Sequence, residues 1–357
     1  MKAFTYVQRA QRVVFGAGRY TTLAQEAAAL GMRRALLVST PSQAARVEQA
    51  VALLGASHVA GVFDGAVMHV PVEVVASARA QLDAAAADGL IALGGGSTVG
   101  LAKALALQTG LPILAVPSTY AGSEMTPVYG ITRDGVKTTG QSARVLPRTV
   151  IYDAELTYGL PAALSVTSAF NAMAHAAEAL YAADANPVTS LMAEEGIRAL
   201  ASAIPALARG AATDAAAVQA RSDALYGAWL SGATLGAVGM ALHHKLCHTL
   251  GGSFNLPHAE AHTVILPHAL AYNASEAPEA MARIARAIGA DDAPLGLYRL
   301  AREHGAPTSL RQLGLSESDL DRVCELALRN QYPNPRALQA EALRGLLRRA
   351  HAGEPPR

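Results

Sequence analysis

Four histidines lie within sixteen residues of one segment, in a chain of 357 residues that contains eleven histidines in all. They are His243, His244, His248 and His258. On a helix, His244 and His248 lie one turn apart on the same face, where two imidazoles can address one metal ion or one substrate. The spacing of these side chains therefore predicts a metal site or a substrate site.

Asn171 and His175 repeat the four-residue offset farther upstream, with an amide in place of a carboxylate. Both pairs lie in segments that are rich in Ala and Leu. Two helices that each offer a one-turn pair of polar side chains are a common way to build a site in a helical domain. We therefore expect the two segments to contribute to one site.

The composition excludes several classes of protein. Apolar residues make up 51% of the chain and charged residues 16%, and the formal net charge is +1. With so few charged residues and so small a net charge, the sequence shows no excess of positive charge that would bind nucleic acid or an anionic membrane surface. We therefore expect a small-molecule partner, no nucleic-acid partner and no membrane partner.

Two features bear on the compartment. Cys247 and Cys324 are too few and too far apart for a disulfide framework, and no charged-then-apolar leader precedes Phe4, so a cytoplasmic location is expected. Residues 224–242 carry no charge over a length that could span a membrane, but four glycines interrupt them. We expect a buried helix there.

The order of the predicted elements indicates two domains. The first part alternates strands with Ala-rich helices, which is typical of a parallel sheet, and residues 133–136 have the pattern of a hairpin turn. Beyond residue 161 nearly all strand signals vanish. We predict an α/β dinucleotide-binding domain at 1–157, an all-helical catalytic domain at 158–357 and an active-site cleft between them. The predicted strands are 35–38, 59–63, 89–93, 112–116 and 149–152, and the predicted helices of this part are 21–30, 72–87 and 98–107.

A glycine-rich turn follows the strand at 89–93 and leads into a helix. Glycines allow close approach of a pyrophosphate, and the helix N-terminus offers unpaired N–H groups. The pattern is not the G-x-G-x-x-G fingerprint. The strand at 35–38 ends without a carboxylate that would select NADH, so both NADH and NADPH remain possible. The predicted cofactor-binding residues are Ser39, Thr40, Gly94, Gly95, Gly96, Ser97, Ser118, Thr119 and Thr126.

Together these residues resemble the iron-containing alcohol dehydrogenases over nearly the whole chain. The matching features are Gly94 to Ser97 before a helix with Ala102-Lys103, a loop that ends in Gly122-Ser123-Glu124, the Asn171 and His175 pair, and His244, His248 and His258 before Leu266-Pro267-His268. The resemblance implies an α/β nucleotide-binding domain, an all-helical domain and a homodimer.

Most members of that family hold iron or zinc with one Asp and three His. The matching positions here are Asn171, His175, His244 and His258, so that Asn replaces the only anionic ligand. Gly100 also stands where the family usually carries Asp. Both departures resemble the maleylacetate reductase branch, which works without the metal. The resemblance therefore implies vestigial ligand positions and no required metal.

That branch implies the NADH- or NADPH-dependent reduction of the carbon–carbon double bond of maleylacetate, a dicarboxylate, to 3-oxoadipate. Hydride would add to the carbon β to the ketone, and imidazole or ammonium donors would stabilise and protonate the enolate. We assign His248 as the leading proton donor. The other expected site residues are His244, His175 and His258 around the pocket, Lys245, Asn171 and Tyr120 for the substrate, and Arg336 as a further carboxylate ligand, whereas Cys247 is expected to pack.

Two alternatives stay open at this point. In a metal-dependent alcohol or polyol dehydrogenase, Asn171 would coordinate the ion through its carbonyl oxygen, and chelation would abolish activity. In a nucleotide-binding sensor without catalysis, the chain would bind NADH but turn over neither an enone nor a carbonyl.

Overall fold

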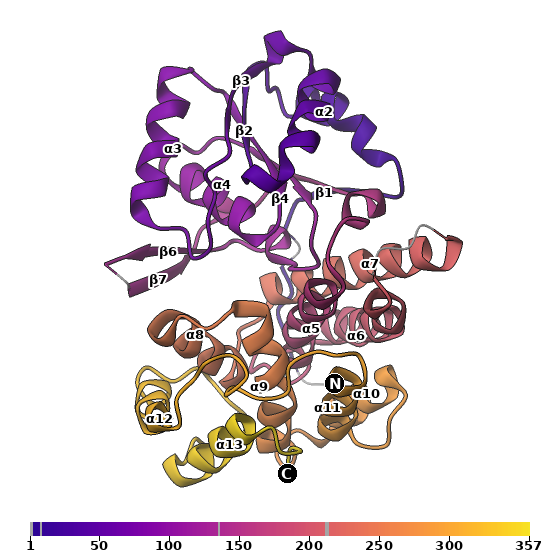
Figure 1. Cartoon of the computed structure of the whole chain (residues 1–357), viewed down its shortest axis with the longest axis vertical. Helices are drawn as coiled ribbons and strands as arrows, with labels where there is room; N and C mark the ends of the chain where they lie inside the picture. Colours follow the sequence, from indigo (N-terminus) through magenta and orange to yellow (C-terminus); the bar gives the residue numbers. More distant parts are fainter. Residues whose placement is uncertain (1–2, 8, 135, 211–213) are drawn as a thin grey trace. The chain divides into compact units, whose positions relative to one another are not determined.

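A computed structural model describes residues 3–7, 9–134, 136–210 and 214–357. Within these ranges the chain forms two compact units, which Figure 1 draws in one view. Residues 9–159 form an α/β unit, and residues 160–357 together with 3–7 form a helical unit. This boundary lies two residues beyond the predicted one. Asp153 after the last strand accepts hydrogen bonds from Gly18 N and Tyr20 N, which joins the end of the α/β unit to its beginning.

The α/β unit is built on a six-stranded sheet with the order β1-β8-β5-β4-β2-β3, in which every pairing is parallel. The predicted parallel sheet is therefore confirmed. Four of the five predicted strands are completely buried, which explains their continuous apolar runs. The strands are β1 (Arg12–Phe15), β2 (Ala35–Val38), β3 (Val59–Phe63), β4 (Gly89–Gly94), β5 (Ile113–Pro117) and β8 (Thr149–Tyr152).

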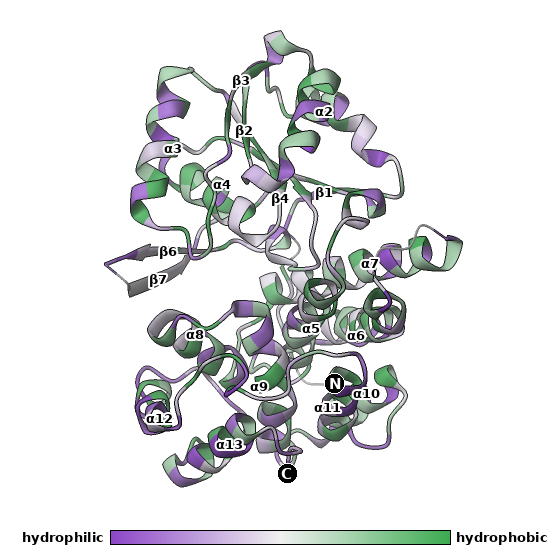
Figure 2. Cartoon of the chain, viewed as in Figure 1, coloured by the Kyte–Doolittle hydropathy of each residue, from purple (hydrophilic) through white to green (hydrophobic). Residues whose placement is uncertain are grey.

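Helices cover both faces of this sheet. Leu36 and Leu90 belong to one hydrophobic cluster with residues of α3 (Val72–Ala84) and α4 (Gly96–Thr109). Leu37 and Ile91, the next residues along the same strands, belong to a second cluster with α1 (Leu23–Ala29) and α2 (Ala44–Leu54). Successive side chains of a strand point to opposite faces, so the alternation builds two cores from one sheet. Figure 2 shows the largely hydrophobic character of the central strands.

A hairpin extends from this unit, as the sequence predicted. β6 (Val128–Arg133) pairs antiparallel with β7 (Val136–Gln141). Asp134 of the predicted turn has a positive φ of 50°, whereas Gly135 lies outside the described residues.

The regular elements among the described residues of the second unit are all helices, which confirms the prediction for the later part of the chain. α5 is buried along most of its length because its Ala-rich surface packs against α6, α7 and α9. α8, α9, α12 and α13 share a second core. The helices are α5 (Ala162–Ala179), α6 (Pro187–Ala208), α7 (Ala215–Ala237), α8 (Leu242–Phe254), α9 (His258–Asn273), α10 (Pro278–Ile288), α11 (Ala293–Glu303), α12 (Leu320–Leu328) and α13 (Ala340–Ala352).

The charge-free stretch 224–242 does not form one helix, contrary to our expectation. α7 ends at Ala237 and α8 begins at Leu242, with 97° between the two helices. A hydrogen bond from Gly239 N to Asp184 Oδ1, 2.9 Å long, stabilises the turn between the two helices. Among the described residues, no single helix has the length and apolar character to cross a membrane, and only the bent pair of α7 and α8 passes that test.

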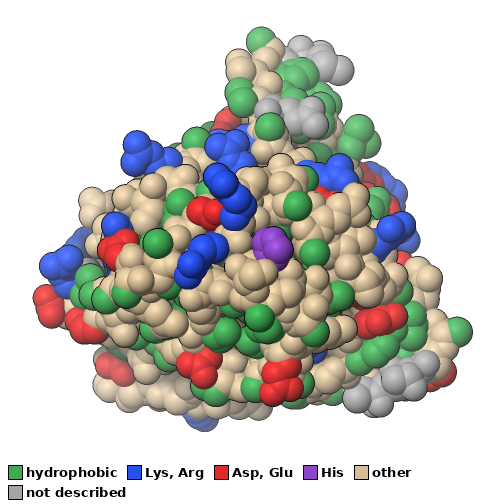
Figure 3. Space-filling model, turned by 90° about the horizontal axis from the view of Figure 1, so that it is seen from above, with side chains coloured by type: hydrophobic (Ala, Val, Ile, Leu, Met, Phe, Trp, Pro, Cys, Tyr) green, Lys and Arg blue, Asp and Glu red, His purple; other side chains and the backbone are tan. Residues whose placement is uncertain are grey.

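Figure 3 shows one face of the molecule, on which acidic and basic side chains are interspersed and hydrophobic ones are scattered. Among the described residues on this face there is no continuous basic patch. This distribution agrees with the small net charge of +1.

Candidate active site

The glycine-rich turn between β4 and α4 has little room for side chains at its first two positions. Gly94 has a φ of +147°, and a Cβ there would lie 2.5 Å from Thr98 Oγ1. A Cβ on Gly95 would lie 2.9 Å from Thr119 Cγ2. At Gly96, the first residue of α4, a Cβ would meet no atom within 4 Å. Side chains at Gly94 and Gly95 would therefore clash with their neighbours, whereas the space at Gly96 is open. Gly96 lies at the N-terminus of α4, where the N–H groups favour an anion.

The other predicted cofactor-binding residues gather around this turn. Ser118 N donates to Gly94 O at 3.1 Å, which ties the loop after β5 to the end of β4. Ser39 Oγ donates to Leu93 O at 3.3 Å, which places the end of β2 beside β4. Thr40 follows Ser39, and Thr119 follows Ser118. Since β2, β4 and β5 are neighbours, these residues share the carboxyl edge of the sheet, where open α/β sheets bind ligands.

Thr126 lies in a different environment from the other predicted cofactor residues. Its hydroxyl donates to Ser123 O and contacts Lys103 Nζ at 2.9 Å. The buried Lys103 ammonium also donates to Ser123 O, Thr126 O and Val128 O at 2.6 to 2.8 Å. Burial lowers the pKa of Lys103 to about 7, and the charge of Glu124 opposes this change. The four oxygens around Nζ accept hydrogen bonds and stabilise the charged form. Lys103 and Thr126 thus hold the loop after β5 in shape.

Gly100, where the resemblance places an Asp, has no room for a longer side chain. A Cβ at this position would lie 2.8 Å from Val70 Cγ2. The change from Asp to Gly is therefore accommodated by local packing against Val70.

Replacing Gly96 with alanine is expected to weaken NADH binding about tenfold, equivalent to about 1.4 kcal/mol, because the methyl group fills the space where the pyrophosphate would approach the helix. The free energy of unfolding should stay within about 1 kcal/mol of the parent value, since alanine suits a helix. Fluorescence titration with NADH measures the affinity. Gly159→Ala is the matched control, because a Cβ there also meets no atom within 4 Å. Equal NADH affinity in G96A and the parent would place the pyrophosphate elsewhere.

In the helical unit, a carboxylate and two of the predicted histidines form a chain of hydrogen bonds. His244 Nδ1 donates to Glu178 Oε2 at 2.7 Å. With its proton on Nδ1, His244 accepts at Nε2, so His175 Nδ1 donates to it across 2.9 Å. All three side chains are buried. The carboxylate therefore fixes the tautomer and orientation of His244, and His244 in turn orients His175.

Glu178 also holds the start of the helix that carries His244. Its carboxylate accepts from Ala241 N at 2.8 Å and from His243 N at 2.7 Å. The first N–H groups of a helix have no partner within the helix, and a negative charge near them is stabilising. Glu178 was not among the predicted site residues, although it lies one turn after His175 on α5 and so shares its face.

A second pair of histidines lies beside this chain. His243 Nε2 and His262 Nδ1 are 2.8 Å apart, and Cys247 Sγ is 3.7 Å from His243 Nε2. Burial and the neighbouring imidazoles lower the pKa of His243 and of His262 well below 6.5, so both rings are neutral. Within the described part of the chain, these three residues are the group whose possible metal-ligand atoms converge, within 4.8 Å. Among the described residues, His175, His244 and His258 do not form such a group.

His248, the predicted proton donor, is hydrogen-bonded to Tyr332, which was not among the predicted site residues. His248 Nδ1 lies 3.0 Å from Tyr332 Oη. Lys245 Nζ lies 5.7 Å from the centre of the Tyr332 ring, and the rings of His248 and His244 are 5.9 Å apart. Burial lowers the pKa of Lys245 and raises that of Tyr332. Tyr332 therefore joins the two side chains that we assigned to proton transfer and to substrate binding.

His258 and Asn171 complete the set of predicted residues in the helical unit. His258 opens α9, and its ring centre is 4.4 Å from that of His262. Asn171 lies one turn before His175 on α5, and its Oδ1 is buried without a hydrogen-bond partner among the described residues. An unsatisfied buried acceptor is costly, so this oxygen is suited to accept a hydrogen bond from a ligand.

The remaining predicted residues lie elsewhere. Tyr120 belongs to the α/β unit, in the loop after β5, where it is fully buried. Arg336 donates to Tyr272 O at 3.0 Å and stacks 4.4 Å from the Tyr272 ring centre, so it lines another part of the helical unit. Burial raises the pKa of Cys247 well above 9.0, which agrees with the expected packing role.

Comparison with known families extends over almost the whole described chain. Residues 10–154 match the family described as iron-containing alcohol dehydrogenase, and residues 165–351 match its C-terminal region. The chain therefore belongs to the iron-containing alcohol dehydrogenase family. It is an NAD(P)H-dependent oxidoreductase, as the nucleotide-type edge of its sheet and its histidine-rich helical site indicated.

Several individual relatives match this chain over its full length. A maleylacetate reductase from Burkholderia cepacia is 57% identical over 356 residues, with 100% of both chains covered. The solved maleylacetate reductase structures from Agrobacterium tumefaciens and from Rhizobium sp. strain MTP-10005 are each 51% identical and cover 100% of both chains, with TM-scores of 0.94 and 0.93. The predicted family and fold class are thus confirmed.

Proposed function

We propose that this chain reduces the carbon–carbon double bond of maleylacetate to give 3-oxoadipate, with NADH or NADPH as the hydride source. The observation that carries the proposal is Asn171, an amide at the position where the family's metal-binding members have a carboxylate. Full-length identity of 57% to a maleylacetate reductase supports the same reaction.

The reaction suits the side chains that the helical unit brings together. The nicotinamide, when bound, supplies hydride to the carbon β to the ketone, and the double-bond electrons move onto the ketone oxygen as an enolate. When both ring nitrogens of His175 carry a proton, Nδ1 donates to His244 and Nε2 donates a hydrogen bond to the enolate oxygen. His248, held by Tyr332, delivers a proton to the carbon α to the ketone. The sum is one hydride and one proton added across the double bond.

Lys245 and Asn171 bind the substrate in this scheme. Lys245 is partly buried and provides a positive charge near Tyr332 for one carboxylate of the substrate. The Asn171 amide can donate through its nitrogen to a substrate oxygen while its unsatisfied Oδ1 accepts from a carboxyl proton or a water molecule. In this proposal, a dicarboxylate substrate therefore contacts the ammonium group of Lys245 and the amide group of Asn171.

We propose that the reaction needs no metal ion. The four family ligand positions hold one amide and three imidazoles, and thus lack the anionic ligand that attracts a hard divalent cation. Two of them also satisfy each other, because His175 Nδ1 and His244 Nε2 are 2.9 Å apart. The conjugated ketone is already activated for hydride addition, which reduces the need for a Lewis acid.

Chelation tests this proposal directly. Protein treated with EDTA should oxidise NADH with maleylacetate at an undiminished rate, and added Fe²⁺ or Zn²⁺ should not raise that rate. Asn171→Asp restores the anionic ligand and should increase the affinity for Zn²⁺ at least about tenfold, measured by competition with a chromogenic chelator. Activity that appears only with metal, or only with simple aldehydes, would instead identify a metal-dependent dehydrogenase in which Asn171 coordinates the ion.

The remaining assignments complete the proposal. The partner is a small dicarboxylate, and the family resemblance supports a homodimer. Cys247 and Cys324 are both free thiols, which supports a reducing, cytoplasmic location. The absence of a carboxylate after β2, where Ser39 and Thr40 follow, supports the use of both NADH and NADPH.

A further inference from the structure

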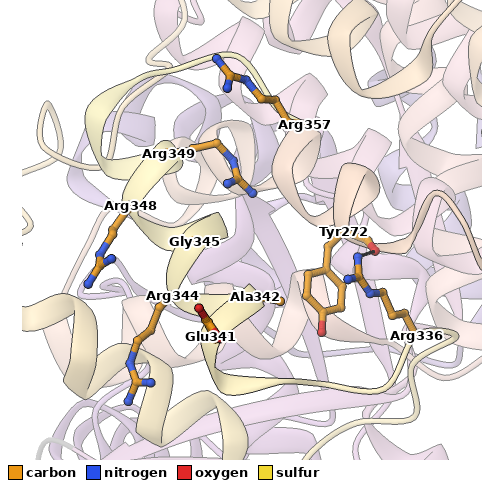
Figure 4. A pocket seen from close by; sticks show the side chains of 9 residues that line it. All are labelled: Tyr272, Arg336, Glu341, Ala342, Arg344, Gly345, Arg348, Arg349 and Arg357. Carbon is orange, nitrogen blue, oxygen red and sulfur yellow. Dashed lines mark hydrogen bonds between the residues drawn. The ribbon is translucent and has the colours of Figure 1, made fainter.

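A strongly basic cavity lies in the helical unit, and none of the histidines of the candidate active site lines it. Its volume is about 770 Å³, and its walls come from α9, from α13 and from the segments around them (Figure 4). Five arginines and one glutamate are among the lining side chains: Arg336, Arg344, Arg348, Arg349, Arg357 and Glu341.

Most of this positive charge has no counter-charge within the described chain. Arg344 pairs with Asp321 at 2.8 Å, and Arg336 is held by the backbone and ring of Tyr272. Among the described residues, Arg348, Arg349 and Arg357 form no ion pair, and Glu341 is the one acidic side chain in the wall. Like charges that gather in one pocket repel one another, so the cluster costs free energy unless an anion enters.

Arg349 is the side chain that points most clearly to a ligand. Its Nε is buried and has no hydrogen-bond partner among the described residues. Figure 4 shows it extending from α13 toward Tyr272 and Arg336, whereas Arg348 turns the other way. His268 on α9 is also buried without a partner for either ring nitrogen. Burial, with a smaller effect of Arg349, lowers the pKa of His268 to about 4, so the neutral ring does not add to the charge.

We propose that this cavity binds a small multivalent oxyanion, either a polycarboxylate or a phosphate compound, through Arg349, Arg357 and Arg336. The planar guanidinium fork matches the oxygen spacing of carboxylate and phosphate groups, and charge-assisted pairs of this kind are among the stronger hydrogen bonds in proteins. The ring of Tyr272 and the aliphatic stem of Arg336 form the less polar wall. The site is separate from the dicarboxylate site proposed above and does not depend on that reaction.

Calorimetric titration of the full-length protein, saturated with NADH to occupy the nucleotide site, tests the proposal. The probes are citrate and pyrophosphate, with acetate at matched ionic strength as the monovalent comparator. At least one trivalent or higher probe should bind at least tenfold more tightly than acetate, with one site per chain. Preference for citrate identifies a polycarboxylate as the ligand class, and preference for pyrophosphate identifies a phosphate compound.

Variants locate the binding. Arg349→Gln and, as an independent change near the chain end, Arg357→Gln should each weaken binding at least tenfold. Arg299→Gln removes an exposed arginine of α11 outside the cavity and should leave the affinity unchanged. Lys245→Gln should also leave it unchanged, because that lysine belongs to the histidine-rich site. The proposal is overturned if neither probe binds better than acetate, if R349Q and R357Q both bind as the parent does, or if K245Q alone removes binding.

Discussion

Replacing His248 with asparagine is expected to lower kcat for maleylacetate reduction by about 10²- to 10⁴-fold, the usual contribution of a positioned general acid. Asparagine keeps a polar side chain of similar reach on α8 but cannot deliver a proton near neutral pH. The affinity for NADH should not change, because the predicted cofactor-binding residues belong to the α/β unit. Stopped-flow oxidation of NADH with saturating maleylacetate measures the effect.

Tyr332→Phe provides the comparison for this result. It removes the hydroxyl that lies 3.0 Å from His248 Nδ1 but keeps the aromatic ring beside Lys245. We expect a smaller loss, about tenfold, because the proton donor remains and only its orientation is relaxed. If H248N kept kcat within about threefold of the parent, the proton would come from another group and our assignment would be wrong.

Replacing Glu178 with glutamine is expected to reduce the free energy of unfolding by about 1–3 kcal/mol, the usual cost of leaving a buried donor without its acceptor. The side chain has zero exposed surface and accepts three hydrogen bonds, from Ala241 N, His243 N and His244 Nδ1. An amide of the same shape brings N–H groups toward these donors and leaves at least one of them unsatisfied. Urea denaturation followed by circular dichroism measures the loss.

Glu195→Gln is the control for that measurement. Glu195 pairs with Arg198 one turn away on α6. Arg198 is exposed and Glu195 is partly exposed, so removal of the pair should cost less than about 1 kcal/mol. A loss below about 1 kcal/mol in E178Q would mean that the start of α8 does not depend on the carboxylate.

The buried strands show that sequence patterns can be sufficient to locate an element of secondary structure. The predicted strands at 35–38, 59–63 and 149–152 coincide with β2, β3 and β8. Buried parallel strands form short, continuous apolar runs between polar turns, and such runs are visible without a structure. β1 was missed because Arg12–Phe15 is an edge strand of four residues that is only partly buried. Its pairing with β8, far along the chain, provides its stability.

The break between α7 and α8 shows where sequence patterns are insufficient. Hydropathy alone favoured one helix through residues 224–242. The turn depends on Asp184 and Glu178, which lie more than fifty residues earlier and accept the N–H groups of Gly239, Ala241 and His243. Neither acceptor lies in the stretch of sequence around the break, so the local hydropathy pattern could not predict it.

Residue types and spacing were enough to identify the family, the glycine turn and the histidine-rich segments, because each of these features lies within a few consecutive residues. The partners of the histidines depended on the tertiary structure. Glu178 is 66 residues from His244, and Tyr332 is 84 residues from His248. Hydrogen bonds over such separations form only after the helices pack, and they then determine which ring nitrogen carries a proton and how each ring is oriented.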